Sequence, residues 1–403
     1  MPSLKLRRID LSASGAAAQI KKLRDQFQAD AYSISPASKK LYTSVFGQPL
    51  TPAAAVQHIC EDVKAKGLSA VLQYTEAFDK VKMKPDAFRV KPSELAEAHK
   101  AAGDDFLEVL RQIRYNVMQF QFGLMHRDAE MRVSGKHELH LRYRPMRRVG
   151  VYCPGGAAAY PSTLLMTICP AQAAGCENII VCLPPKDTGA YNQEMLATCY
   201  ELGIKEVYRV GGAQAIAAMA YGVEGLEAVD MIVGPGNQPV ALAKRYVYGT
   251  VAIDCHAGPS EIIVAADDSA HPDYVALDLI AQAEHAPGAA ILVTWYEPLI
   301  EEMQASLEKR LAKLSRGDMA RESLERYGAL ILAPDKQSAI DCVNTLAPEH
   351  LHIQTRDPDG FTRKASGFIF TLSNASVYCK TAESPFALTS SQMCCTAAAG
   401  VRG

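Results

Sequence analysis

Residues 147–185 decide the fold of this chain: RRVGVYC (147–153) is followed by STLLMTICPAQAAG (162–175) and then by NIIVCLPP (178–185). The first and third stretches are short apolar runs bounded by glycine or proline, which is typical of buried strands. The middle stretch is long enough for a helix. A strand, a helix and a second strand in this order favour a parallel sheet with the helix packed on one face.

The same alternation continues along the chain. KEVYRVGG (205–212) and DMIVGPGN (230–237) continue the first series, and a second series runs from EIIVAAD (261–267) to SGFIFTL (366–372). Strands that alternate with helices form open, largely parallel sheets with helices on both faces. We therefore predict an α/β fold with two Rossmann-like, doubly wound units.

This pattern also predicts the domains. In residues 1–150 apolar residues recur at three- and four-residue spacing, so we expect a helical N-terminal part, which packs with a Rossmann-like unit at 261–372. Residues 151–260 form the other Rossmann-like unit. Residues 373–403 are small, polar and without periodicity, and we expect a short, divergent tail there.

The composition excludes several classes of protein. The chain has 403 residues, 48% of them hydrophobic and 21% charged, which suits two globular domains rather than a disordered or fibrous chain. A formal net charge of −2 argues against a nucleic-acid or membrane-surface binder. No apolar run approaches the roughly 18–20 residues that cross a bilayer. We predict a soluble, cytoplasmic protein whose eleven cysteines are mostly buried and reduced.

Four glycine-rich turns fall where predicted strands end: Pro154–Gly156, Gly211–Gln214, Gly234–Asn237 and Gly258–Glu261. Open α/β sheets bind ligands at the carboxyl ends of strands, where glycines let the backbone approach closely and helix N-termini offer free N–H groups. None of these turns is the G-x-G-x-x-G fingerprint, and each alone could be a plain strand–helix turn. Together they favour a crevice for a nucleotide or a small anion.

Two further motifs offer side chains for a metal and for acid–base chemistry. Gln282 and His285 are three residues apart on a predicted helix, so both can reach one metal ion, and their mixed donors suit zinc or manganese. Glu349 and His350 lie in a predicted turn and are the usual acid–base types near neutral pH. The alternative for Gln282 and His285 is a polar helix end without a metal, and the alternative for Glu349 and His350 is a solvent-exposed polar turn.

These motifs, in this order, resemble those of the histidinol dehydrogenase family. The blocks that carry the resemblance are RVGVY (148–152), PGG (154–156), YPST (160–163), VGGAQAIA (210–217), IVGPGN (232–237), AGPSE (257–261), QAEH (282–285) and APEHL (347–351). The resemblance implies a homodimeric, zinc-dependent enzyme with two Rossmann-like units. Such an enzyme oxidises L-histidinol through L-histidinal to L-histidine and reduces two NAD⁺.

The resemblance also implies the binding residues. Tyr152, Gln214 and Asn237 would contact NAD, and Ser260 would contact the substrate, a small amino alcohol. These four residues belong to the glycine-rich turns or come directly before them, so the family pattern and the crevice predicted from the turns involve the same places in the chain.

The metal and catalytic roles are implied in the same way. Gln282 and His285 would ligate zinc and, through the metal, hold the substrate amine and imidazole. Glu349 would activate the water that attacks the aldehyde, and His350 would contact the substrate and act as base on the alcohol. One pair of acid–base groups can serve two oxidations while the metal fixes the orientation of the substrate.

The C-terminal part departs from the family pattern. The family continues with a Gly-Asp-Tyr block that supplies a zinc ligand and with a tail that supplies a Glu and a His. Here Glu383 is the only carboxylate side chain after Asp359, and no histidine follows His352. We therefore expect weakened zinc binding and absent or very slow histidinol oxidation. The tail at 373–403 is either a frame-shift product or a real divergence.

Two alternatives to histidinol oxidation remain open from the sequence. One is a related enzyme that oxidises another polar alcohol, such as a sulfonated diol, with the same NAD and zinc. The other is a catalytically inactive paralogue, since the tail ligands are missing. Retention of Gln282, His285, Glu349 and His350 favours an enzyme, whereas the changed tail favours the inactive paralogue.

Overall fold

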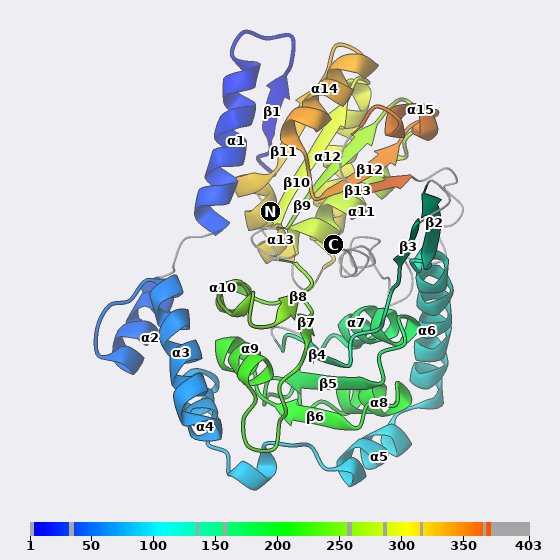
Figure 1. Cartoon of the computed structure of the whole chain (residues 1–403). Helices are drawn as coiled ribbons and strands as arrows, with labels where there is room; N and C mark the ends of the chain where they lie inside the picture. The colour runs from blue at the N-terminus through cyan, green and yellow to red at the C-terminus, as the bar shows by residue number, and fades with distance from the viewer. Residues whose placement is uncertain are drawn as a thin grey trace. The chain divides into compact units, whose positions relative to one another are not determined.

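The computed structural model consists of two compact units, each built around its own parallel sheet (Figure 1). Unit one combines an N-terminal segment with the C-terminal third of the chain, and unit two is a continuous segment between them among the described residues. The structure describes residues 4–31, 36–133, 137–155, 159–255, 260–284, 288–314, 317–365 and 368–371. The predicted α/β class, with parallel sheets and helices on both faces, is confirmed.

Unit two contains a sheet in the order β6-β5-β4-β7-β8, and every neighbouring pair is parallel. Its strands are β4 (Arg148–Tyr152), β5 (Asn178–Leu183), β6 (Glu206–Arg209), β7 (Met231–Val233) and β8 (Ala252–Ile253). The chain passes from β4 outward to β5 and β6 and then returns to β7 on the other side of β4. This reversal is the topological switch point of the sheet, where open α/β folds bind ligands.

Helices cover both faces of this sheet. On one face α7 (Pro161–Ala173) and α8 (Gln193–Glu201) pack on Val149 and Val151, and on the other α9 (Gly212–Tyr221) and α10 (Gln238–Val247) pack around Ile180. Five earlier helices and a hairpin belong to the same unit. They are α2 (Pro36–Phe46), α3 (Pro52–Lys66), α4 (Leu68–Asp79), α5 (Pro92–Ala101) and α6 (Asp104–Leu124), with strands β2 (Ala129–Val133) and β3 (His137–Leu141).

The helical N-terminal part divides differently from the prediction. Of this part, only the first described segment, residues 4–31, belongs to the unit that contains the C-terminal third of the chain. Helices α3, α5 and α6 instead contact α9, α8 and α7 of unit two. The reason is packing, because apolar side chains of α3, such as Ile59 and Val63, share one buried cluster with the alanine-rich face of α9. The predicted boundary at residue 150 is therefore corrected.

Unit one contains a parallel sheet in the order β1-β11-β10-β9-β12-β13. Its strands are β1 (Arg7–Asp10), β9 (Ser260–Ala266), β10 (Gly288–Thr294), β11 (Ala329–Leu332), β12 (His350–Gln354) and β13 (Phe368–Thr371). Strand β1, from the N-terminal segment, completes one edge beside β11. The chain runs from β9 outward to β10 and β11 and then returns to β12, so the switch point lies between β9 and β12.

Alternating residues of β9 separate two apolar clusters. Ile262 and Val264 face helices α11 to α13, whereas Ile263 and Ala265 face α1 and α14, as a strand buried on both faces requires. The helices of this unit are α1 (Ala16–Ala31), α11 (Pro272–Ala283), α12 (Pro298–Leu311), α13 (Gly317–Tyr327), α14 (Lys336–Leu346) and α15 (Pro358–Thr362).

Two expectations about composition can be compared with the described residues. None of the helices found there is long and apolar enough to cross a membrane. Six of the cysteines there are buried thiols, as predicted: Cys60, Cys153, Cys169, Cys182, Cys199 and Cys342. Burial raises the pKa of Cys60 to about 12 and that of Cys169 to about 11, so these thiols stay protonated near neutral pH.

Candidate functional site

The residues predicted to contact NAD lie at the carboxyl edge of the sheet of unit two. Tyr152 is the last residue of β4, Asn237 lies between β7 and α10, and Gln214 lies in the first turn of α9. Gly234, at the end of β7, has a φ of +113°, and a Cβ there would lie 2.0 Å from the carbonyl oxygen of Tyr152. Only glycine fits this conformation, which brings the loop after β7 against the end of β4 at the switch point.

Two of these side chains are buried beside each other. The Tyr152 hydroxyl accepts a hydrogen bond from the backbone N–H of Gly212 at 3.2 Å, and burial raises the pKa of Tyr152. Gln214, two residues further on, is 1% exposed, and its Nε2 has no hydrogen-bond partner within the described part of the chain. Asn237 is exposed and caps α10, because its Oδ1 accepts from the N–H of Val240 at 3.3 Å.

A buried ion pair that we did not predict from the sequence supports the loop after β7. Lys244 of α10 is paired with Asp254, and both side chains are almost fully buried. Lys244 Nζ also donates to the carbonyl oxygen of Gly234 at 3.0 Å, and the Gly234 N–H donates to Asp254 Oδ2 at 2.8 Å. The only sequence signal for this pair is a lysine placed among the apolar residues of α10.

The described residues among those predicted to bind substrate and metal lie in unit one, at the amino edge of its sheet. Ser260 is the first residue of β9 and His350 the first of β12, so both stand at amino ends of neighbouring strands. Gln282 lies near the C-terminal end of α11, just before β10. The turn Gly258–Glu261 was expected to follow the end of a strand. This expectation is wrong for Ser260 and Glu261, which begin β9, whereas Gly258 lies outside the described residues.

Gln282 and Ser260 are in direct contact. Gln282 is 2% exposed, and its Nε2 donates to Ser260 Oγ at 2.6 Å. With its nitrogen engaged in this bond, the amide oxygen of Gln282 is the atom that suits a metal ion. His285, the second predicted metal ligand, lies outside the described residues. Of the two predicted metal ligands, the structure therefore describes Gln282 alone.

Glu349 and His350 are both held by Glu261, the second residue of β9. Glu349 Oε2 accepts from the backbone N–H of Glu261 at 3.3 Å, and His350 Nδ1 lies 3.2 Å from its carbonyl oxygen. His350 Nδ1 and Glu349 Oε2 are 3.5 Å apart. The turn is possible because Ala347, with a φ of +47°, ends α14 in the left-handed conformation. The side chain of His350 is 4% exposed, so the alternative of a plain exposed turn does not describe it.

The contact with Glu261 indicates which tautomer a neutral His350 adopts. A carbonyl oxygen can only accept a hydrogen bond, so the proton of a neutral imidazole lies on Nδ1, and Nε2 keeps its lone pair. Such a tautomer is suited to take a proton from an alcohol. Burial raises the pKa of the Glu261 carboxyl, which marks this part of the sheet as poorly hydrated.

A second polar cluster lies deeper in the same unit, and we did not predict it. Asp278 of α11 accepts from His352 Nδ1 and from Gln354 Nε2, both at 2.8 Å. All three side chains are at most 6% exposed. Asp278 and His352 are far apart in the sequence, and a helix aspartate carries no local signal of such a contact.

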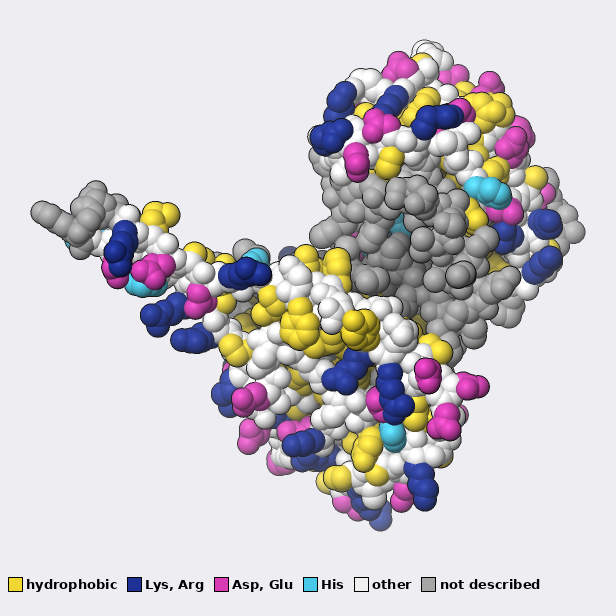
Figure 2. Space-filling model, turned by 90° about the vertical axis from the view of Figure 1, so that its right-hand side faces the viewer, with side chains coloured by type: hydrophobic (Ala, Val, Ile, Leu, Met, Phe, Trp, Pro, Cys, Tyr) yellow, Lys and Arg dark blue, Asp and Glu magenta, His cyan; other side chains and the backbone are white. Residues whose placement is uncertain are grey.

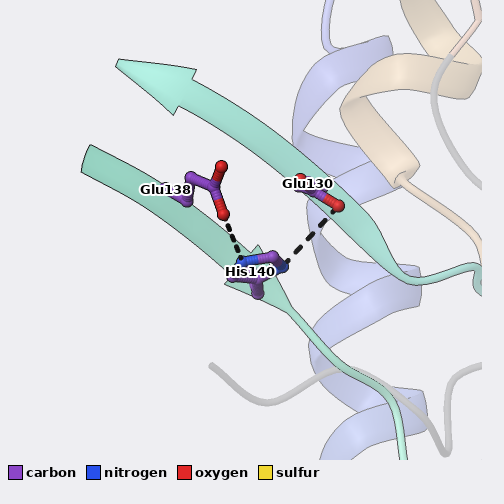
Figure 3. Close-up of side chains that lie close together, drawn as sticks. All are labelled: Glu130, Glu138 and His140. Carbon is purple, nitrogen blue, oxygen red and sulfur yellow. Dashed lines mark ion pairs between the residues drawn. The ribbon is translucent and has the colours of Figure 1, made fainter. Parts of the chain in front are cut away.

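The hairpin β2–β3 carries another group of potential metal ligands. Glu130, Glu138 and His140 offer ligand atoms within 4.8 Å of one another (Figure 3). His140 Nδ1 lies 3.9 Å from Glu130 and His140 Nε2 lies 3.6 Å from Glu138. All three side chains are exposed, and the two ion pairs account for their proximity.

Comparisons with known proteins now identify the family. The sequence profile described as histidinol dehydrogenase matches residues 49–379. This chain belongs to the histidinol dehydrogenase family. The matched residues include Tyr152 and Gln214 of unit two and Glu349 and His350 of unit one, so the family assignment predicted from the motifs is confirmed.

Individual relatives agree with this assignment. Histidinol dehydrogenase of Rhodopirellula baltica is 50% identical over 355 residues, which are 88% of this chain and 77% of the relative. The enzyme of the same name from Bacillus subtilis is 42% identical over 318 residues, 78% and 74% of the two chains. The crystal structure of histidinol dehydrogenase from Elizabethkingia anophelis matches with a TM-score of 0.79 at 31% identity and covers 91% of this chain and 80% of that one.

Proposed function

We propose that this member of the histidinol dehydrogenase family oxidises L-histidinol through L-histidinal to L-histidine, the last steps of histidine biosynthesis, with NAD⁺ as the hydride acceptor. Family membership supports the reaction. The observation that carries the proposal is the arrangement of Glu349 and His350, two acid–base groups 3.5 Å apart that are both held by the backbone of Glu261.

His350 serves the first oxidation. Its Nδ1–H donates to the carbonyl oxygen of Glu261, so Nε2 can take the proton of the substrate hydroxyl while hydride leaves the alcohol carbon. NAD⁺, when bound, accepts that hydride. The aldehyde then needs water, and Glu349, whose side chain is 35% exposed, is placed to take a proton from a water that attacks the carbonyl carbon. One hydroxyl of the hydrate then loses its proton while the carbon gives a hydride to a second NAD⁺, which leaves the carboxylic acid.

The carboxyl edge of unit two suits NAD. Gln214 Nε2 is buried and has no partner among the described residues, and a buried donor left unsatisfied costs about 1–3 kcal/mol. Such a group fits a site that is completed by a ligand. Tyr152 and Asn237 lie at neighbouring strand ends of the same edge, and the close approach at Gly234 brings their loops together.

The amino edge of unit one suits a metal ion. The amide oxygen of Gln282, with its nitrogen bonded to Ser260, together with the imidazole of His285 would form the mixed donor set that zinc accepts. When bound, zinc would orient the substrate amine and imidazole. Because structural and catalytic zinc sites use three or four protein ligands, the weak binding expected from the sequence stays a prediction.

The assembly that we propose is a homodimer in the cytoplasm. Large apolar side chains are exposed along α6 and the β2–β3 hairpin: Tyr115, Phe120, Phe122, Leu124, Met125, Met131, Leu139, Leu141 and Tyr143. Figure 2 faces the side on which α6 lies in Figure 1 and shows apolar side chains grouped on that surface. Contiguous exposed apolar surface of this kind marks interaction sites. Light scattering of the purified chain should give the mass of two copies.

Turnover by the purified chain tests the proposed function. The chain is incubated with Zn²⁺, NAD⁺ and L-histidinol, and NADH and histidine are measured. We expect two NADH for each histidine, and Glu349→Gln should give more than two NADH for each histidine, because histidinal accumulates. NADH formation from a sulfonated diol but not from histidinol would instead show the related polar-alcohol enzyme. No turnover of either alcohol, with NAD⁺ still bound, would instead bear out the absent oxidation that the changed tail predicts and would show an inactive paralogue.

A further inference from the structure

Strand β12 carries a row of buried polar side chains on one face. His350, His352 and Gln354 alternate with Leu351 and Ile353, so the polar residues share the face toward α11 and the apolar residues lie in the opposite cluster. The three polar side chains are 3%, 3% and 6% exposed. Burial of polar groups is unfavourable unless they are hydrogen-bonded, so this row needs partners on the facing helix.

Asp278 is the partner of two members of the row. Its Oδ2 accepts from His352 Nδ1 and from Gln354 Nε2, each at 2.8 Å, and the carboxylate is 3% exposed. A carboxylate in such surroundings is tolerated only with hydrogen-bond donors in good geometry. The contact therefore fixes both the height of α11 along β12 and its rotation about the helix axis.

The same helix and strand also carry two residues of the proposed site, Gln282 and His350, a short distance along each element. Gln282 follows Asp278 by four residues, which is about 6 Å along a helix and on the same side of it. His350 precedes His352 by two residues, which is about 6.6 Å along a strand and on the same face. The two steps are nearly equal, so a contact that fixes Asp278 against His352 also fixes Gln282 relative to His350.

We propose that Asp278, His352 and Gln354 are positioning residues of the active site. They set the register of α11 against β12, so that Gln282 stays bonded to Ser260 while His350 stays on the backbone of Glu261. Their role is to keep a constant distance between the amide of Gln282, which would bind the metal, and the imidazole of His350, which would act as the base. This inference rests on the proposed function.

If the contact of Asp278 with His352 only stabilised the fold, its loss would have a different effect from the loss of a positioning contact. Removal of one partner destabilises a protein, because the other partner stays buried without compensation, so a merely stabilising contact lowers the melting temperature of the variant but not the rate of the protein that stays folded. A positioning role instead predicts that an apolar replacement slows the reaction of a folded protein. Misplacement of a reacting group by about 1 Å can cost on the order of a hundredfold in rate.

Three substitutions on one strand separate these roles. His352→Leu removes the donor to Asp278, His352→Asn keeps an amide N–H about where Nδ1 lies, and Ile353→Ala creates a cavity on the opposite face without touching α11. With Zn²⁺, NAD⁺ and L-histidinol we expect His352→Leu to lower kcat about ten- to a hundredfold, with the KM for NAD⁺ unchanged. His352→Asn should recover most of that loss. Ile353→Ala should melt earlier than the unmodified chain but keep its kcat.

Hydrogen exchange supplies a measurement that does not depend on turnover. In His352→Leu, amides of the last turn of α11, residues 280–283, should exchange faster, whereas Ile353→Ala should speed exchange throughout unit one. Equal kcat in all three variants, or equal exchange of α11 in the leucine and alanine variants, would overturn the inference. If the unmodified chain does not oxidise histidinol, the proposed function fails, and the exchange comparison alone decides the positioning role.

Discussion

The two sheets place their predicted functional residues at opposite edges. In unit two Tyr152, Gln214 and Asn237 lie at the carboxyl ends of strands, next to the N-termini of α9 and α10. In unit one Ser260 and His350 begin their strands, next to the C-terminal end of α11. The rule that ligands bind at the carboxyl edge of an open α/β sheet therefore agrees with the position proposed for one site and not with that proposed for the other.

The difference has an electrostatic meaning. Helix N-termini carry partial positive charge and favour anions, whereas helix C-termini carry partial negative charge and favour cations. The edge of unit two thus suits the diphosphate of a dinucleotide. The edge of unit one suits a metal ion and a cationic amine. The same α/β architecture thus offers a site for anions at the carboxyl edge of a sheet and a site for cations at the amino edge. The following predictions test this contrast between the two edges.

The largest effect is expected at the amino edge of unit one. His350→Ala should lower kcat about 10²- to 10⁴-fold, the usual contribution of a general base. Glu349→Gln should impair the second oxidation more than the first, because water activation is needed only for the aldehyde. The measurement is the ratio of NADH to histidine over time, with added L-histidinal as a second substrate. Full activity of His350→Ala would show that the amino edge is not the reaction site.

The second effect concerns the support of the carboxyl edge in unit two. Lys244→Met leaves the Asp254 carboxylate buried without its ion-pair partner, so the free energy of unfolding should fall by about 3–5 kcal/mol. Denaturant unfolding measures this loss. The matched control is Lys336→Met, which removes a solvent-exposed pair with Asp357 and should leave stability nearly unchanged. Equal losses in the two variants would show that the buried pair does not support the loop at Gly234.

The third effect is a loss of NAD affinity without a loss of stability. Gln214→Ala removes an amide nitrogen that makes no hydrogen bond within the described structure, so the melting temperature of the free chain should change little. We expect NAD⁺ to bind about tenfold more weakly, the equivalent of about 1.4 kcal/mol. Calorimetric titration with NAD⁺ measures the affinity. Unchanged affinity together with a large loss of stability would identify Gln214 as a core residue.

The smallest effect is a pH dependence at Glu261. Burial raises the pKa of this carboxyl above its ordinary value of 4.5, so the folded state holds the proton more tightly than the unfolded state. Stability from this group is present below pH 4.5 and is lost as the pH rises through the folded pKa. Glu261→Gln should therefore melt higher than the unmodified chain at pH 7 and no higher at pH 4. A difference in melting temperature that does not vary with pH would contradict this.

Local patterns predicted the fold well and the docking of its parts less well. RRVGVYC and NIIVCLPP form β4 and β5 as expected, because short apolar runs bounded by glycine or proline have few other stable states. The sequence of α3 shows that it has an apolar face but not which partner that face contacts. The assignment of the N-terminal helices to the wrong unit follows from this limit.

The site shows the same limit. Glu349 and His350 were recognisable because they are adjacent and of acid–base type, and Gln282 because of its spacing from His285. The contact of Asp278 with His352 and that of Lys244 with Asp254 were missed, since each joins elements that only the folded sheet brings together. The side chains proposed to act directly stand in local sequence patterns, whereas those proposed to hold them in place are joined by tertiary contacts.

Strand β1 has a consequence for the order of folding. It pairs in parallel with β11, Arg7 opposite Ala329, so the sheet of unit one needs both early and late parts of the chain. Unit two lies between them as one continuous segment. During synthesis unit two can therefore close while β1 still waits for its neighbour, because domains fold as units and distant pairing forms slowly. A chain that leaves the ribosome can therefore already hold a folded unit two while β1 has yet to pair with β11.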